Sequence, residues 1–461
     1  MKNAALLCAV LLLLSGCAGR DYQIPADDIL TEAQMQEQYT IDREWWKSYN
    51  DESLNTLVDM ALERNIDLAR SAVTVNKALY QARQLGADLV PSFSGSGSAG
   101  SRSNLETGTA TRSFDASFGL SYELDLWGRL RDAASAQVWT YEATEQDREA
   151  ARLALVNSVV NTWYSLAYTS RALELGRESL NYYERLHAIT QNKYRAGQTD
   201  GLDPAQTEQS LLSQKNTVLS LEEQLNEEWQ TLRNLLDLRP DETIDLPLPD
   251  LLAANVPSVD LNVPVEALGA RPDVNAARFR LLSAFRDQNA ARSDLFPAIS
   301  IGGTLGLSAA SASDLVSSSF LNGLVSLSLP FLDWNRVKWN VRIAEADFED
   351  AKLAFRQSVT TALNEVSFYY SSLQNSIQQF ETIQKKYDAD QRVEAYRKAR
   401  YEQGADELKD WLEALKACND SRLSVLERKY GIISASNAVW QAMMMPNMID
   451  FNLYTSYLMK W

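Results

Sequence analysis

Two halves of this chain repeat each other. The letters YELDLWGR occupy Tyr122–Arg129, and LPFLDWNR occupies Leu329–Arg336. Gly197 and Gly404, in the tetrapeptides YRAG and YEQG, are separated by the same number of residues as these two segments. A repeat of this kind limits the fold, because both copies must form the same structural unit.

The first residues are predicted to be a lipoprotein signal peptide, residues 1–16. Lys2 supplies the positive end, and the apolar run Ala4–Leu14 is too short to span a bilayer as a helix. The letters LSGC, which end at Cys17, match a bacterial lipobox, so we expect cleavage before Cys17 and acylation of that residue. Ala18 follows it, which by similarity to bacterial lipoproteins favours the outer membrane. The alternative is an ordinary secretory signal.

Prolines and the repeat divide the rest of the chain. We assign residues 54–238 and 266–443 to the two repeats, with a proline-rich linker at 239–265. Residues 17–53 form an N-terminal arm, in which Trp45 and Trp46 are expected to dock, and residues 444–461 form a C-terminal tail.

Composition excludes several classes of partner and site. Acidic residues outnumber basic ones, 61 to 44, which disfavours nucleic acid. Cys8 leaves with the signal and Cys418 is then alone, so no disulfide framework exists. No further apolar run of about 18 residues follows the signal, so a membrane crossing would have to use β-strands.

Four segments alternate apolar and polar residues with a period of two. In the second of them Phe114, Phe118 and Leu120 alternate with polar or small residues. We predict strands of about ten residues, the length typical of a transmembrane β-barrel, over 93–101, 113–123, 299–308 and 321–329. A loop is expected at 102–112. A soluble β-sandwich is disfavoured, since the intervening sequence is helical.

Long helices follow each strand pair. They are predicted over 131–195 and 337–403, each about 100 Å long, with returning helices at 204–238 and 408–443. A helix in two pieces broken near Asn65 precedes the first strand. Apolar residues in the second long helix recur in heptad steps, which predicts a coiled-coil seam: Phe355, Val359, Ala362, Val366, Tyr369 and Leu373.

Four strands cannot close a barrel, and lipid tolerates no open sheet edge. A long antiparallel helix pair likewise encloses too little core to stand alone. Both arguments predict that several copies of the chain share one barrel.

The lipobox, the repeat and the YELDLWGR and LPFLDWNR segments together resemble the outer membrane factor family, whose best-known member is TolC, and its lipidated OprM-like and NodT-like branch. The resemblance implies a mixed α and β membrane protein with a two-fold internal repeat. It also implies a homotrimer, in which four strands per chain make a 12-stranded transmembrane β-barrel continuous with a long periplasmic α-helical barrel. The arm and the linker would form an equatorial belt.

The same resemblance implies a passive exit duct in the outer membrane, anchored by lipid and extending into the periplasm. Its partners would be a periplasmic adaptor protein and an inner-membrane pump of RND or ABC type, in an efflux or export system. A type I protein secretion duct is an alternative. A lipid-anchored coiled-coil scaffold outside the bilayer is a further one.

Site residues follow from the family pattern at the helix tips. Acidic residues six and nine positions after the tip glycine line the family's periplasmic constriction, which implies Asp410 and Glu413 here, and Asp203 in the first repeat. Tyr401 matches a tyrosine that holds the tips closed. Three-fold symmetry would turn each carboxylate into a ring that favours cations.

Other roles for the tip residues stay open. Asp203 precedes Pro204, as a helix N-cap does. Asp410 and Glu413 also suit an ordinary solvated helix face. Asp406 stands where the family has a basic residue, a departure that bears on the salt link that holds some relatives closed.

Trp127 and Trp334 lie where strand turns to helix, and we interpret them as interfacial aromatic anchors rather than substrate contacts. No catalytic constellation occurs, and His187 is the single histidine, so neither an enzyme nor a metal site is expected. Met443, Met444, Met445 and Met448 suit soft copper, but an apolar tail explains them too. No cofactor is expected besides the covalent lipid on Cys17.

Overall fold

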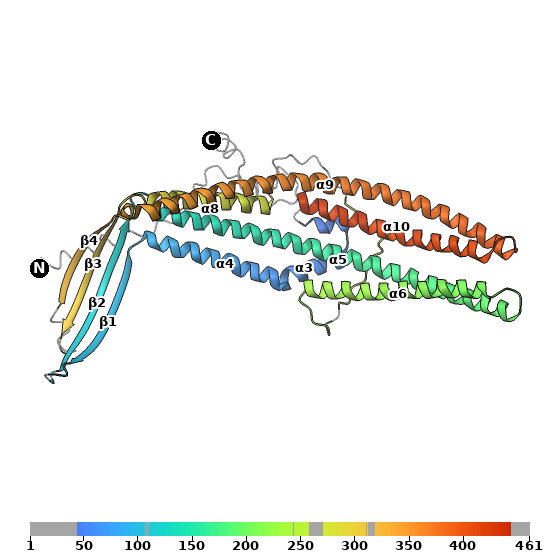
Figure 1. The fold of residues 1–461 in the computed structure, drawn as a ribbon, viewed down its shortest axis with the longest axis horizontal. Coiled ribbons are helices and arrows are strands. Elements are labelled where there is room, and N and C mark those ends of the chain that lie inside the picture. Colours follow the sequence, from blue (N-terminus) through green and yellow to red (C-terminus); the bar gives the residue numbers. More distant parts are fainter. Residues whose placement is uncertain are drawn as a thin grey trace.

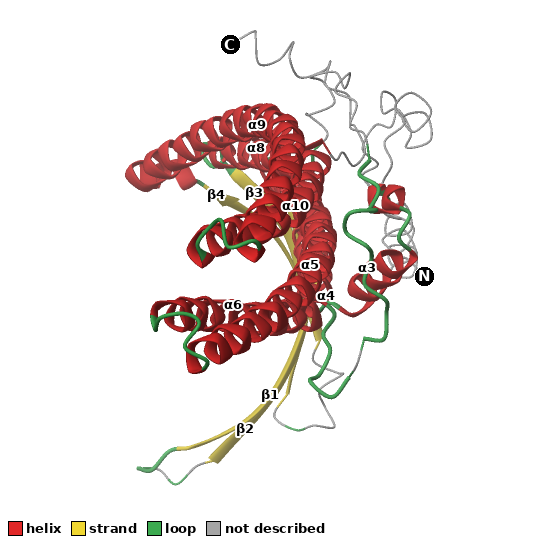
Figure 2. Cartoon of the chain, turned by 90° about the vertical axis from the view of Figure 1, so that its right-hand side faces the viewer, coloured by secondary structure: helices red, strands yellow, loops and turns green. Residues whose placement is uncertain are grey.

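The chain is elongated and mostly helical, with a small antiparallel sheet at one end. The computed structural model describes residues 44–106, 108, 110–242, 244–257, 271–309, 311 and 319–443. Four strands extend from one end of the helical body, and two helical hairpins end at the other (Figure 1). Seen from the hairpin end, the helices form a curved layer with α3 (Glu52–Arg64) on its convex side (Figure 2). Residues 1–16, Cys17 and the tail 444–461 lie outside the described residues.

The sheet has the order β1-β2-β3-β4, with every neighbouring pair antiparallel. Its strands are Ser92–Ser103, Ala110–Leu124, Ala298–Ala309 and Ser319–Ser328. The four predicted strands are therefore confirmed. The central pair β2–β3 joins the two halves of the chain, with Phe118 opposite Leu305 and Tyr122 opposite Ile301.

The predicted loop at 102–112 is wrong at both ends. Arg102 pairs with Thr111 across β1 and β2, so the strands continue to within a few residues of the turn. The apolar alternation that marked the strands stops earlier because these residues are polar. Backbone pairing does not require apolar side chains. The hydrogen-bonded part of each strand therefore extends beyond the residues that alternate apolar and polar.

Asn65 separates the first two helices, α3 and α4 (Ile66–Gly86), where the break was predicted. Its side-chain oxygen accepts a 3.0 Å hydrogen bond from the backbone N–H of Leu68, which caps α4. Its amide nitrogen donates to the backbone carbonyl of Leu235, 2.9 Å away. The residue that ends one helix therefore also fixes it against α6 (Leu202–Leu235).

Two very long helices form the body, α5 (Arg129–Arg195) of 67 residues and α9 (Trp334–Glu402) of 69 residues. Each is followed by a returning helix, α6 in the first half and α10 (Leu408–Met443) in the second. We call α5–α6 the first hairpin and α9–α10 the second hairpin. A further helix, α8 (Pro272–Ser293), lies between α5 and α9 in the half of the body that adjoins the sheet (Figure 1).

The main apolar core lies in the middle of the helical body, where the N-terminal arm docks. Trp45, Trp46 and Tyr49 of the 3-10 helix η1 (Trp45–Tyr49) are buried there against α5, which confirms the expected docking of the tryptophans. The Tyr49 hydroxyl donates a 2.5 Å hydrogen bond to the side-chain oxygen of Asn437 on α10. The indole N–H of Trp163 on α5 donates to Asp51.

Two of the predicted heptad residues of α9 are buried in the structure. Ala362 and Leu373 are buried, and Val366 and Tyr369 pack in the cluster that Leu373 forms with Ile432 and Val439 of α10. The coiled-coil seam within the second hairpin is thus confirmed for Val366, Tyr369 and Leu373. Among the described residues, no helix is both long and apolar enough to cross a membrane.

Candidate functional site at the helical tips

Both hairpins turn through the same structure, which we call the tips (residues 196–201 and 403–407). Gly197 and Gly404 have φ values of +67° and +72°, a region that suits glycine and ends helices. The backbone N–H of Gln198 donates to the carbonyl of Lys193 at 2.9 Å, and that of Ala405 to Arg400 at 2.8 Å. This shared geometry fixes where each returning helix begins.

Asp203 does not cap α6, so the capping interpretation is wrong. The helix begins at Leu202, with Gly201 in the cap position, and Asp203 lies in its first turn. The side chain of Asp200 accepts the Leu202 N–H at 2.9 Å instead. The Asp203 carboxylate accepts a 2.5 Å hydrogen bond from the hydroxyl of Thr199, within its own tip.

Tyr401 contacts both hairpins. Its hydroxyl accepts a 3.2 Å hydrogen bond from the ammonium of Lys193, at the end of α5. Its ring stacks on the buried ring of Trp411 of α10, with centroids 5.2 Å apart. Tyr401 therefore lies between the hairpins, as the family pattern implied, but its polar partner is a lysine.

Asp406 is bound within the second hairpin. Its carboxylate pairs with Arg400 at 2.7 Å and with Arg397 at 3.0 Å, and its side chain is only 6% exposed. Hydrogen bonds from Arg400 and then Arg397 hold the pKa of the Asp406 carboxyl below its usual value. The acid that replaces the family's basic residue thus finds its partners on α9, not on the first hairpin.

The two acidic residues of α10 that were predicted to line the constriction differ in exposure. Asp410 is half-buried in the first turn, whereas Glu413 is exposed and lies 3.8 Å from Lys409. Within one chain, the described contacts of Asp203, Asp410 and Glu413 do not join them to one another. Carboxylate rings would require further copies of the chain.

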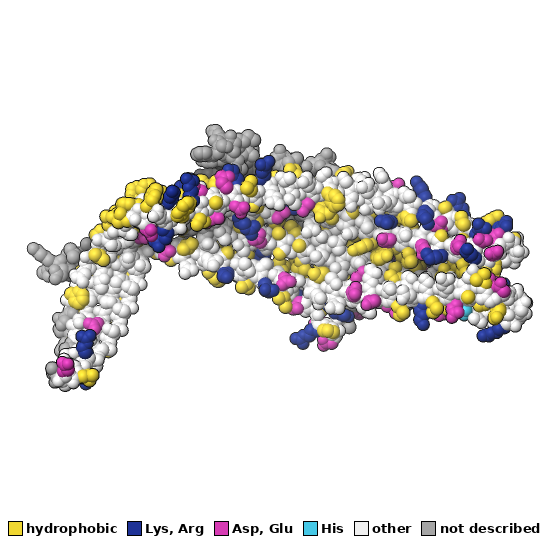
Figure 3. Space-filling model, viewed as in Figure 1, with side chains coloured by type: hydrophobic (Ala, Val, Ile, Leu, Met, Phe, Trp, Pro, Cys, Tyr) yellow, Lys and Arg dark blue, Asp and Glu magenta, His cyan; other side chains and the backbone are white. Residues whose placement is uncertain are grey.

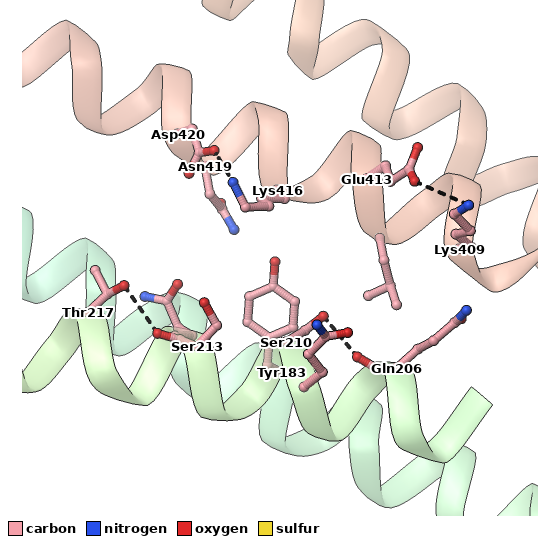
Figure 4. A pocket seen from close by; sticks show the side chains of 13 residues that line it. Tyr183, Gln206, Ser210, Ser213, Thr217, Lys409, Glu413, Lys416, Asn419 and Asp420 are labelled. Carbon is pink, nitrogen blue, oxygen red and sulfur yellow. Dashed lines mark hydrogen bonds and ion pairs between the residues drawn. The ribbon is translucent and has the colours of Figure 1, made fainter. Parts of the chain in front are cut away.

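A polar groove of about 480 Å³ separates α6 from α10 near the tips, with Tyr183 of α5 at its back (Figure 4). Gln206 and Glu413, which occupy equivalent positions after the two tip glycines, face it from opposite helices. Burial raises the pKa of Tyr183 to about 12, so its hydroxyl stays protonated and bonds to Asn419. Besides Leu412, the lining consists of amides, hydroxyls and paired charges.

The aromatic residues at the strand-to-helix junctions differ. The indole N–H of Trp127 donates to the backbone carbonyl of Pro297, and its ring stacks on Phe296. Trp334 begins α9 and is 55% exposed. Figure 3 shows hydrophobic side chains gathered where the sheet meets the helices, and Leu332 and Trp339 are among the exposed ones.

Other chemistry-bearing side chains have structural partners. His187 lies 3.1 Å from the hydroxyl of Thr207, between α5 and α6. Burial raises the pKa of the Cys418 thiol, which disfavours the reactive thiolate. The described residues hold no group of three His, Cys, Asp or Glu that could bind a metal. Of the tail methionines, Met444, Met445 and Met448 lie outside the described residues.

Sequence reasoning missed Lys193 and the two arginines that bind Asp406. Arg397 and Arg400 stand at helical spacing before the tip, and Asp406 lies just after it, so a local ion pair could have been inferred. Lys193 offered no such signal, because its partner Tyr401 is on the other hairpin.

Comparison with known proteins places the chain in a family. The sequence model for outer membrane efflux proteins matches residues 57–237 and 263–443. The chain is 40% identical over 446 residues to the toxin and drug export protein A of Aggregatibacter actinomycetemcomitans, which covers 96% of this chain and 98% of that protein. It is 27% identical over 440 residues to the cation efflux system protein CusC of Escherichia coli K12, covering 91% and 94%.

A crystal structure of a membrane protein from Pseudomonas aeruginosa has the same fold. It matches with a TM-score of 0.80 at 26% identity, over 92% of this chain and 98% of that one. The family's sequence model matches two segments of the chain, and the relative that is 40% identical covers nearly the whole chain. Both findings agree with the fold described above. The chain belongs to the outer membrane efflux protein family.

Proposed function

We propose that three copies of this chain assemble into the outer-membrane exit duct of a tripartite efflux pump. The observation that carries the proposal is the open sheet: among the described residues, β1 and β4 each pair on one side only. Unpaired backbone N–H and C=O groups are too costly in hydrocarbon, so each edge must meet the edge of another copy. Three copies of four strands make a closed barrel of 12 strands.

Exposed side chains on both halves of the molecule support assembly. Phe118 of β2 is 62% exposed and Leu321 of β4 is 77% exposed, which suits a face toward lipid. On α9, Leu353 and Phe368 are 62% and 68% exposed along a helix that would otherwise face water. Neighbouring copies would cover this surface and complete a helical barrel through the periplasm.

The remaining segments have roles in the same assembly. The arm at 17–53 and the linker at 239–265 would form the equatorial belt around the two repeats, 54–238 and 266–443. Acyl chains on Cys17, after removal of residues 1–16, would anchor each copy to the outer membrane. A periplasmic adaptor and an inner-membrane pump of RND or ABC type would open and power the duct.

Flow through the duct would be controlled at the tips. Three-fold repetition of Asp203, Asp410 and Glu413 would place rings of carboxylates at the narrow end, which attract cations. Tyr401 would hold the hairpins together in the closed state, and Trp127 and Trp334 would lie at the membrane interface as aromatic anchors.

A second role, a duct for secreted proteins, is favoured by one observation. The relative that is 40% identical is named a toxin and drug export protein. The groove and tips alone do not distinguish the two cargoes, since the pump supplies selection in either case. Deleting the inner-membrane transporter genes of the host one at a time, and assaying drug resistance and protein secretion separately, distinguishes them.

Planar-bilayer recording of the purified, assembled protein tests the duct. We expect small conductance from the native protein and larger conductance from an Asp410→Asn, Glu413→Gln double variant. Trimers that never conduct, even in the double variant, would count against a duct. A Cys17→Ser protein exported by a cleavable signal, if released as a soluble particle, would instead support a lipid-anchored scaffold.

A further inference from the structure

Part of one face of the sheet carries only small side chains on β1, β2 and β3. Side chains alternate between the two faces of a strand, so the residues next to Phe118 point away from the face that we assign to lipid. We call this opposite face the lumen face. Three rows of paired residues cross the three strands on it, and all of their members are serine, threonine or glycine: Ser96, Ser117 and Gly306; Ser94, Gly119 and Thr304; Ser92, Ser121 and Gly302.

The fourth strand breaks this pattern. Phe320 of β4 pairs with Gly306, and Leu324 pairs with Gly302, so both belong to the lumen face. Phe320 is 50% exposed and Leu324 is 64% exposed. The Phe320 ring lies over Gly306, where an added Cβ would overlap it, so the glycine makes room for the ring. Because the neighbouring Leu321 points the other way, β4 presents large apolar side chains on both of its faces.

Neither lipid nor a neighbouring copy covers Phe320 and Leu324 in the proposed barrel. Lipid would contact the opposite face of the sheet. The open edge of β4 would meet β1 of the next copy, and the lumen-face residues of β1 from 92 to 98 are all serine. A serine side chain is too short to bury a phenyl ring or a leucine. The two side chains would therefore stay exposed to the molecules that pass through the lumen.

Two carboxylates of the lumen face have polar partners of their own. Asp115 accepts a 2.7 Å hydrogen bond from the hydroxyl of Ser308. Glu123 pairs with Arg129 at 2.7 Å. Carboxylates attract cations of any shape, whereas an exposed ring and an exposed leucine add a contact only for molecules with apolar surface. Charge and apolar contact can therefore be tested separately.

We propose that Phe320 and Leu324 form an apolar strip on which aromatic, amphipathic cargo binds during its passage through the barrel. The two residues lie about 13 Å apart along β4, and three copies would supply three such strips. An aromatic molecule would stack on the Phe320 ring and cover the Leu324 side chain, which removes apolar surface from water. This proposal rests on the proposed duct and names the class of cargo that its barrel favours.

Blockade of single channels in planar bilayers tests the strip. The full-length assembled protein carries Asp410→Asn and Glu413→Gln as a background, so that the tips do not limit the current. Ethidium is the aromatic probe, added on the side of the sheet, and tetraethylammonium is the matched probe with the same charge and no ring. We expect ethidium to interrupt the current several-fold longer than tetraethylammonium does.

Phe320→Ser in this background should shorten the ethidium blockades several-fold, and Leu324→Ser should shorten them less. Asn322→Ser is the matched control, because Asn322 is polar and lies between the two residues on the same face of β4. We expect unchanged ethidium blockades in that control. Tetraethylammonium blockades and the conductance without probe should stay the same in all three variants.

Phe320→Leu keeps an apolar side chain and removes the ring, so it tests the stacking contact even if the serine variant does not assemble. Its ethidium blockades should be shorter than those of the background. Blockades of unchanged length in Phe320→Leu would overturn the role of the ring.

The proposed strip and the proposed duct fail in different ways. Ethidium blockades of unchanged length in both serine variants, in channels that conduct, would overturn the strip and leave the duct intact. Equal shortening in Asn322→Ser would reduce the effect to a wider lumen and would overturn the apolar contact. Absence of conductance in every protein, including the background, would contradict the duct itself.

Discussion

The indole N–H of Trp127 donates a 2.8 Å hydrogen bond to the backbone carbonyl of Pro297. This bond joins the β2–α5 junction in the first half of the chain to the α8–β3 junction in the second half. The two rings of Trp127 and Phe296 stack 4.8 Å apart at the same place. The point where the sheet leaves the helices is thus fixed by contacts between the two halves of the chain.

Trp127→Phe should weaken this junction, because it keeps a stacking ring and removes the donor. We expect a loss of about 1 kcal/mol in the free energy of unfolding, measured by denaturant titration followed by circular dichroism. Trp334→Phe, at the equivalent and 55% exposed position, is the control and should change it by less than about 0.5 kcal/mol. Equal losses in the two variants would show that the hydrogen bond to Pro297 does not contribute to the free energy of unfolding.

Charge on the apolar face of β2 should block membrane insertion. Phe118 and Ser117 are adjacent and point to opposite faces of the strand. Phe118→Arg should cost about 2–4 kcal/mol per copy if that face meets lipid, and Ser117→Arg much less. Membrane fractionation of both variants gives the answer; equal insertion would mean that this face does not contact lipid.

Neutralising Asp410 should weaken block by multivalent cations. In the proposed assembly, three copies of the half-buried Asp410 carboxylate would form a ring that binds such ions. Asp410→Asn should therefore raise the blocking concentration several-fold when the ion is added at the tip side. Asp420→Asn, further along α10 and paired with Lys416 at 2.7 Å, is the control. An unchanged block in Asp410→Asn would move the selectivity site elsewhere.

Acid should loosen the second tip through Asp406. Its pKa is depressed in the folded chain by Arg400 and Arg397, so its ionised form stabilises the tip at pH values above the unfolded value of 3.8. That contribution is lost as the pH falls through the still lower folded value. In hydrogen exchange at residues 403–408, Asp406→Asn should exchange faster than the native chain at neutral pH.

The difference in exchange rate between the native chain and Asp406→Asn should shrink as the pH is lowered below about 4. Glu407→Gln, an exposed neighbour, serves as the control and should leave the exchange rate unchanged at either pH. A ratio of exchange rates that stays constant across this range would show that the carboxylate does not stabilise the tip.

Local signals predicted much of the fold. Asn65 has a side chain that caps a new helix, and Gly197 and Gly404 supply the positive φ that a helix end requires. The alternation of apolar and polar residues in β2 is likewise visible within that one strand. The tryptophans of the arm are another case, since Trp45 and Trp46 are too large and apolar to remain in water.

Contacts between distant segments could not be predicted from the sequence. The Lys193–Tyr401 pair depends on how two hairpins pack, which no short spacing encodes. Asp203 shows a subtler limit: an Asp before Pro suits a cap, but Asp200 already accepts the first-turn N–H, so the helix begins earlier. Strand ends were also misjudged, because Arg102 and Thr111 pair through their backbones.

Native mass spectrometry of the full-length protein, extracted in detergent, tests most directly whether the open edges of β1 and β4 meet in an assembly. We expect a single species of three copies, each carrying the added mass of acyl chains on its first residue. A species of one copy that retains its four-stranded sheet would contradict the closed barrel and, with it, the duct.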